Sequence, residues 1–107
     1  MKLIVVLGRK AFKDELSNVF KNTNVPIYSE MNIKGIKSEQ TGADMQNWFG
    51  GKVDPDFSVM LFAFVPQEAA ASIMHGIDKL NESMDGDYPF HAFQLAVEQY
   101  TGISRPS

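Results

Sequence analysis

The apolar positions of the first third of the chain follow two different periods. Residues Leu3–Leu7 are continuously apolar and rich in branched side chains, which is typical of a strand covered on both faces. The next stretch, Ala11–Asn22, has an apolar stripe at helical spacing, formed by Phe12, Leu16, Val19 and Phe20. From Ile27 to Ile36 the period becomes two, with one mostly apolar side and one mostly polar side, which predicts a strand.

The second half of the chain repeats this plan. Ser58–Val65 predicts a strand that Pro66 ends. Gln67–Asn81 predicts a helix, whose apolar stripe is Ala69, Ile73, Ile77 and Leu80. Phe90–Tyr100 predicts a last strand.

The element order is therefore strand, helix, strand, long loop, strand, helix, strand. With right-handed crossovers, both helices lie on one face of a four-stranded antiparallel sheet. The predicted fold class is α+β, a ferredoxin-like βαββαβ sandwich. We expect residues 1–107 to form a single domain, with a long loop at Ser38–Phe57 and a flexible tail at Ser104–Ser107.

Composition and charge narrow the function classes. The chain has 107 residues, no cysteine and a net charge of -3. The absence of cysteine excludes disulfides and thiolate metal sites. It is also compatible with a cytoplasmic location, which we predict. Without a basic cluster, neither nucleic-acid binding nor membrane-surface binding is expected. The apolar start is too short to insert into a membrane and is interpreted as a buried strand.

The strand Ser58–Val65 predicts an oligomer. One side carries Val59, Leu61, Ala63 and Val65, and the other carries Met60, Phe62 and Phe64. In an isolated ferredoxin-like domain the side facing away from the helices would meet water. Large exposed apolar patches usually mark an interface, so we expect sheet faces to pack together in a closed homo-oligomer. Coverage of this side by the chain's own loop is the alternative.

Five segments in order along the chain resemble the PII-like family, the trimeric nitrogen-regulatory signalling proteins and their relatives. They are Arg9–Leu16, Asn32–Ile36, Gln40–Gly42, Val65–Glu68 and Val97–Gly102.

The resemblance implies a non-enzymatic homotrimeric sensor of a small ligand, in which a projecting T-loop, here Ser38–Phe57, binds a partner protein such as a transporter. It also implies ligand clefts between subunits. Carried over to this chain, their residues are Gly35, Lys37, Gln40, Asp85, Gly86, Asp87 and Arg105.

The turn before the predicted last strand departs from the pattern of the nucleotide-binding members of the family. The stretch Glu82–Pro89 is acidic and contains no lysine or arginine, and Arg105 is the one arginine near the C-terminus. Phosphates require backbone N–H groups together with Lys or Arg, and carboxylates repel them. The sequence therefore argues against sensing of ATP and 2-oxoglutarate of the usual PII kind.

The loop Ser38–Phe57 is long for a connection inside a compact domain, and such loops are often functional. We interpret Trp48 and Phe49, with Met45 one turn earlier, as anchors for a partner protein. The alternative is that Trp48 and Phe49 fold back onto the core.

His91, on the predicted last strand near Glu82, Asp85 and Asp87, is a weak candidate for a divalent-metal ligand. The residues around it lack ligand spacing, so an ordinary half-buried histidine is the favoured interpretation.

No catalytic signature is present in the sequence. Two alternatives to a regulatory protein remain open. One is a small oligomeric ferredoxin-like enzyme of the monooxygenase or isomerase type, with His91 as its general base. The other is a CutA-like metal-tolerance trimer, against which the long Ser38–Phe57 loop argues.

Overall fold

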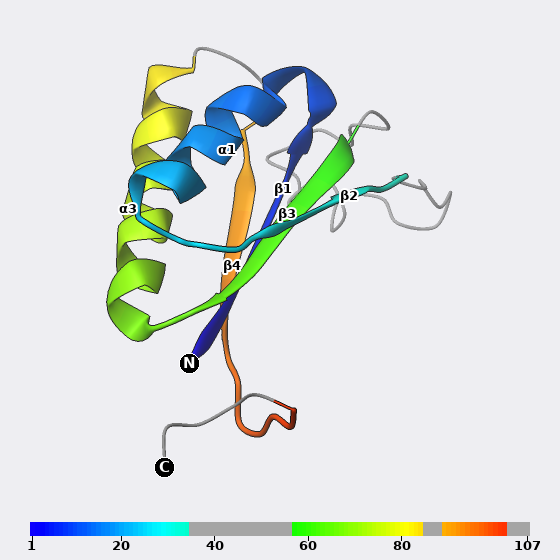
Figure 1. The fold of residues 1–107 in the computed structure, drawn as a ribbon. Helices are drawn as coiled ribbons and strands as arrows, with labels where there is room; N and C mark the ends of the chain where they lie inside the picture. Colours follow the sequence, from blue (N-terminus) through cyan, green and yellow to red (C-terminus); the bar gives the residue numbers. More distant parts are fainter. Residues whose placement is uncertain (35–56, 85–88, 103–107) are drawn as a thin grey trace, which may run out of the picture.

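A four-stranded sheet carries both helices on one of its faces (Figure 1). The computed structural model describes residues 1–34, 57–84 and 89–102. Its strands are β1 (Lys2–Arg9), β2 (Ser29–Asn32), β3 (Phe57–Val65) and β4 (His91–Ala96). A 3-10 turn, η1 (Lys10–Phe12), leads into α1 (Lys13–Asn22), and the second helix is α3 (Gln67–Ser83). Adjacent strands run antiparallel in the order β2-β3-β1-β4, which confirms the predicted ferredoxin-like fold class.

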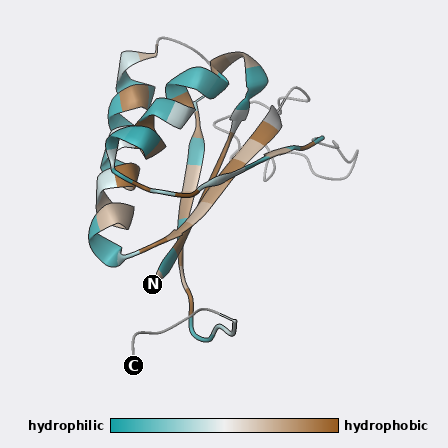
Figure 2. Ribbon diagram, in the orientation of Figure 1, coloured by the Kyte–Doolittle hydropathy of each residue, from teal (hydrophilic) through white to brown (hydrophobic). Residues whose placement is uncertain are grey.

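The core lies between the sheet and the helices. It takes every second residue of the two central strands, and Ile4, Val6, Val59 and Leu61 are fully buried. The helices contribute the stripes that the sequence predicts, with Leu16 and Phe20 from α1 and Ile73 and Ile77 from α3. Figure 2 shows hydrophobic residues along β3 and bands of hydrophobic and hydrophilic residues along α3. Neither helix in the described part of the chain is long and apolar enough to cross a membrane.

Helix α1 ends in a Schellman motif. Asn24 has a φ of 60°, and its N–H donates to the Lys21 carbonyl at 3.2 Å while the Val25 N–H donates to the Phe20 carbonyl at 3.4 Å. Asparagine is one of the few residues that adopt this left-handed conformation at small cost. The motif turns the chain back towards the sheet and buries Val25.

The second strand differs from its prediction in length and in orientation. β2 covers only Ser29–Asn32, and the predicted positions Gly35 and Ile36 lie outside the described residues. Its apolar side does not face the helices, since Ile27 is 77% exposed. Instead Tyr28, from the predicted polar side, stacks on Phe20 with ring centroids 5.2 Å apart. The ring of Tyr28 supplies the apolar area that packs against Phe20, although the tip of this side chain is polar.

The observed bounds of β3 and β4 also differ from the predicted ones. Phe57, predicted as the last loop residue, is the first residue of β3. The prediction of a last strand to Tyr100 is wrong at its C-terminal end, because β4 stops at Ala96. Past that point the chain leaves the sheet (Figure 1), and the Val97 N–H donates to the Met1 carbonyl at 3.2 Å. Neighbouring β1 begins at Lys2, so further residues of β4 have no strand to pair with.

Candidate functional surface and the anchored start of β4

The sheet face opposite the helices is apolar except at two positions on its edge strands. Strand register arranges its side chains in three rows across the sheet. The first row is Met31, Met60, Leu7 and His91; the second is Ser29, Phe62, Val5 and Phe93; the third is Phe64, Leu3 and Leu95. We call these positions the open face. Every one is apolar except Ser29, at the β2 edge, and His91, at the β4 edge.

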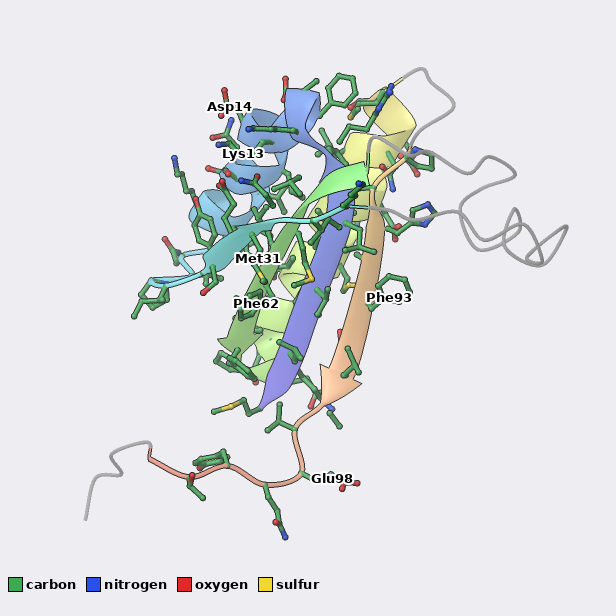
Figure 3. All side chains as sticks on the ribbon, turned by 90° about the vertical axis from the view of Figure 1, so that its right-hand side faces the viewer. Lys13, Asp14, Met31, Phe62, Phe93 and Glu98 are labelled. Atoms are coloured by element: carbon green, nitrogen blue, oxygen red, sulfur yellow. The ribbon has the colours of Figure 1, made fainter. Side chains whose placement is uncertain are left out.

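Three apolar side chains of the open face are largely exposed, and the other apolar ones are half-buried. Phe64 is 56% exposed, Leu95 48% and Met31 46%. Figure 3 looks onto this side of the sheet and shows Met31, Phe62 and Phe93 standing on three different strands. Phe62 and Phe64 pack edge to face, with ring centroids 6.5 Å apart. The structure thus confirms the prediction that β3 is apolar on both sides. Soluble monomers rarely leave such a contiguous apolar patch uncovered.

An amide side chain fixes the start of β4. The Asn81 Nδ2 group donates to the Phe90 carbonyl at 2.9 Å, and the Phe90 N–H donates to Asn81 Oδ1 at 2.8 Å. The two hydrogen bonds have the pattern that paired residues of antiparallel strands exchange, and they join the last turns of α3 to the residue before β4. It holds the Phe90 ring, 3% exposed, against the backbone of Gly8. Periodicity gives no signal for this contact, because its two partners lie on either side of a polar stretch.

Replacing Asn81 with leucine is expected to lower the free energy of unfolding by roughly 2–4 kcal/mol, because both backbone groups of Phe90 lose their partner. Asn81→Asp keeps the acceptor and loses the donor, so an intermediate loss is expected. Urea denaturation followed by circular dichroism measures both. Ser83→Ala is the matched control, since it removes an exposed 2.8 Å hydrogen bond from Ser83 Oγ to the Leu80 carbonyl. Equal losses in Asn81→Leu and Ser83→Ala would contradict this role.

The predicted ligand-binding and partner-binding residues lie outside the described part of the chain. These are Gly35, Lys37, Gln40, Met45, Trp48, Phe49, Asp85, Gly86, Asp87 and Arg105. For the segment 85–88 the structure nevertheless fixes both ends. The Met84 N–H donates to the Leu80 carbonyl at 3.0 Å on one side, and the Asn81–Phe90 pair holds the other.

His91 is half-buried at the β4 edge of the open face, and this burial lowers the pKa of its imidazole. Among residues 1–34, 57–84 and 89–102, no three His, Cys, Asp or Glu side chains come close enough together to hold a metal ion. Glu82 is exposed on α3, and the other proposed neighbours of His91, Asp85 and Asp87, are not among these residues.

A shallow groove of about 470 Å³ runs between the two helices, on the far side of the molecule from the open face. Glu15 and Val19 of α1 and Gly76, Lys79 and Leu80 of α3 are among its lining residues. The close crossing depends on Gly76, where a Cβ atom would lie 2.8 Å from Val19 Cγ1. His91, the one predicted site residue that the structure describes, does not line this groove.

The architecture defines a ferredoxin-like α+β protein, and solved structures share this fold. A protein of the DUF3240 family from Shewanella baltica OS155 matches with a TM-score of 0.64 and 13% identity over 96% of both chains. CPII from Thiomonas intermedia K12, bound to ADP, AMP and acetate, matches with a TM-score of 0.61 and 18% identity over 88% of this chain and 82% of CPII. CPII bound to ADP, AMP and bicarbonate, which is described as a nitrogen regulatory PII-like protein, matches with a TM-score of 0.55 and 17% identity over 92% and 94%.

At these identities the likeness establishes the fold. No family model matches the sequence, and no match is found among curated proteins.

Proposed function

We propose that this protein is a divergent PII-like regulatory protein, an oligomeric and non-enzymatic sensor of a small ligand that acts in the cytoplasm on a partner protein. The observation that carries the proposal is the open face, an apolar surface on a fold shared with PII-like proteins. A catalyst needs groups that converge on a substrate, whereas this surface offers apolar area for assembly.

The proposed assembly is a homotrimer that buries the open faces of its subunits against one another. Closed rotational symmetry lets each copy present the same surface and leaves none of it free. Covering one phenylalanine side chain fully contributes roughly 1.5–3 kcal/mol. The open face carries Phe62, Phe64 and Phe93 together with leucine, valine and methionine side chains. Assembly therefore has ample apolar area from which to gain stability.

The proposed ligand cleft lies between subunits and includes Gly35, Lys37, Gln40, Asp85, Gly86, Asp87 and Arg105. The CPII structures hold ADP and AMP with acetate or bicarbonate, which makes these molecules the first ligands to test. Lys37 and Arg105 would supply positive charge for an anionic ligand. The carboxylates of Asp85 and Asp87 disfavour a ligand with many negative charges. AMP or bicarbonate suits this set of residues better than ATP.

The loop Ser38–Phe57 is the proposed partner-binding segment, with Met45, Trp48 and Phe49 as its anchors. A membrane transporter is the class of partner we propose, from the resemblance to PII-like proteins. Large aromatic side chains give much contact area for little loss of conformational freedom, which suits them to this role.

A thermal-shift screen with AMP, ADP, bicarbonate and ATP plus 2-oxoglutarate tests the ligand proposal. We expect AMP or bicarbonate at 100 times its Kd to raise the melting temperature by roughly 10 °C, because it then stabilises the folded state by about 2.7 kcal/mol, and each kcal/mol shifts the midpoint of a domain of this size by about 4 °C. ATP plus 2-oxoglutarate should give a smaller rise. Lys37→Ala and Arg105→Ala should abolish the rise, whereas Lys79→Ala, in the helix groove, should keep it. An unchanged melting temperature with every compound would refute this sensor role.

A further inference from the structure

His91 occupies an unusual place on the open face. It ends the first row at the β4 edge, directly opposite Leu7 of β1, with Met60 of β3 and Met31 of β2 beyond it. Along β4 the next residue on the same side is Phe93. The imidazole is thus the single ionisable side chain in three rows that are otherwise apolar, apart from Ser29.

The groups beside this row come from β1, α3, β3 and β2. On β1, Arg9 follows two residues after Leu7, beyond a register shift between Gly8 and Arg9. On the side of α3, the group that reaches the start of β4 is the neutral amide of Asn81. The facing positions of β3 and β2 carry methionine.

We propose that His91 makes self-association of the open faces sensitive to pH, so that the assembly forms when the imidazole is neutral and loosens when it is protonated. This inference rests on the proposed assembly through the open face. The underlying cause is desolvation. A second copy seated on the first row would remove water from His91, and a charged imidazolium costs more to remove from water than a neutral imidazole.

The direction of the effect follows from the pKa. Burial already lowers the pKa of His91 in the single chain, which favours the neutral form. Covering the face lowers this pKa further, so assembly is coupled to loss of a proton. Association is then fully favourable above the pKa of the free subunit and weakens as the pH falls below it. Each covered His91 raises the dissociation constant by up to about tenfold per pH unit below that value.

Analytical ultracentrifugation of the full chain at pH 7.5 and pH 5.0 tests the proposal, with circular dichroism to confirm that the subunit stays folded. We expect an oligomer at pH 7.5 and a shift towards monomer at pH 5.0. His91→Phe should remain assembled at both values, because it keeps a ring without a charge. His91→Lys should be monomeric at both. His75→Phe is the matched control at an exposed position of α3 and should keep the pH response of the unchanged protein.

The remaining outcomes contradict either the role of His91 alone or the proposed assembly as well. An oligomer of equal stability at both pH values overturns the role of His91 and leaves the proposed assembly intact. Dissociation of His91→Phe on acidification also overturns it, because another group would then be responsible. A folded monomer at pH 7.5 would overturn both this inference and the proposed assembly.

Discussion

Replacing Phe62 with lysine is expected to convert the proposed assembly into folded monomers. Phe62 lies in the middle row of the open face, between Ser29 of β2 and Val5 of β1. In an assembly this position is covered, so the variant loses apolar contact and buries an ammonium group. We expect the dissociation constant to rise at least 100-fold, equivalent to about 3 kcal/mol. Sedimentation velocity over a range of protein concentrations measures it.

The matched control adds the same charge to the opposite layer. Ala71 is exposed on α3, so Ala71→Lys should leave the assembly unchanged. The subunit of Phe62→Lys should keep its far-ultraviolet circular dichroism, because the helix side of the sheet is not altered. If Phe62→Lys assembles as tightly as Ala71→Lys, the open face is not the interface.

The substitution Gly8→Ala is expected to cause the largest loss of stability for a single methyl group. A Cβ atom on Gly8 would overlap Phe90 Cδ1 and lie 2.6 Å from Cε1, and the Phe90 ring is only 3% exposed. The ring cannot swing aside freely, because Asn81 holds the backbone of Phe90 through two hydrogen bonds. Overpacking of this kind costs roughly 1–3 kcal/mol, and we expect the upper end. Urea denaturation gives the value.

A second glycine provides the comparison. At Gly76 a Cβ atom would lie 2.8 Å from a terminal methyl carbon of Val19, which is half-buried, and alanine also favours the helix by up to about 1 kcal/mol. Gly76→Ala should therefore cost clearly less than Gly8→Ala. Adding Phe90→Leu to Gly8→Ala should recover part of the loss, because the smaller side chain makes room for the methyl group. A Gly8→Ala variant as stable as the unchanged protein would contradict the tight packing.

The helices and central strands were predictable because their signal is local. The spacing of Leu16 and Phe20, or of Ile73 and Ile77, defines a helix face whatever it packs against, and all four side chains are buried. The apolar character of both sides of β3 was visible for the same reason, since alternate residues of a strand always point to opposite faces. Fold class followed from element order, because few topologies satisfy the handedness of the crossovers.

The edges of the sheet could not be predicted in this way. The extent of an edge strand depends on its pairing: β4 ends at Ala96, opposite the first residue of β1, and β2 pairs with only four residues of β3. The burial of Tyr28 instead of Ile27 depends on the position of Phe20, which lies on another element. The Asn81–Phe90 pair and the contact of Phe90 with Gly8 likewise join residues that no sequence period connects.

Local sequence patterns were enough to specify the ferredoxin-like fold class, the two helix stripes and the apolar side chains on both sides of β3. They could not specify that those side chains join with Leu3, Val5, Leu7, Phe93 and Leu95 in one surface, or that His91 lies at its edge, which the folded sheet establishes. Side-chain alternation is a property of one strand, whereas a surface is set by the register between strands. That register turns separate apolar residues into the open face on which the proposed assembly and its control by pH depend.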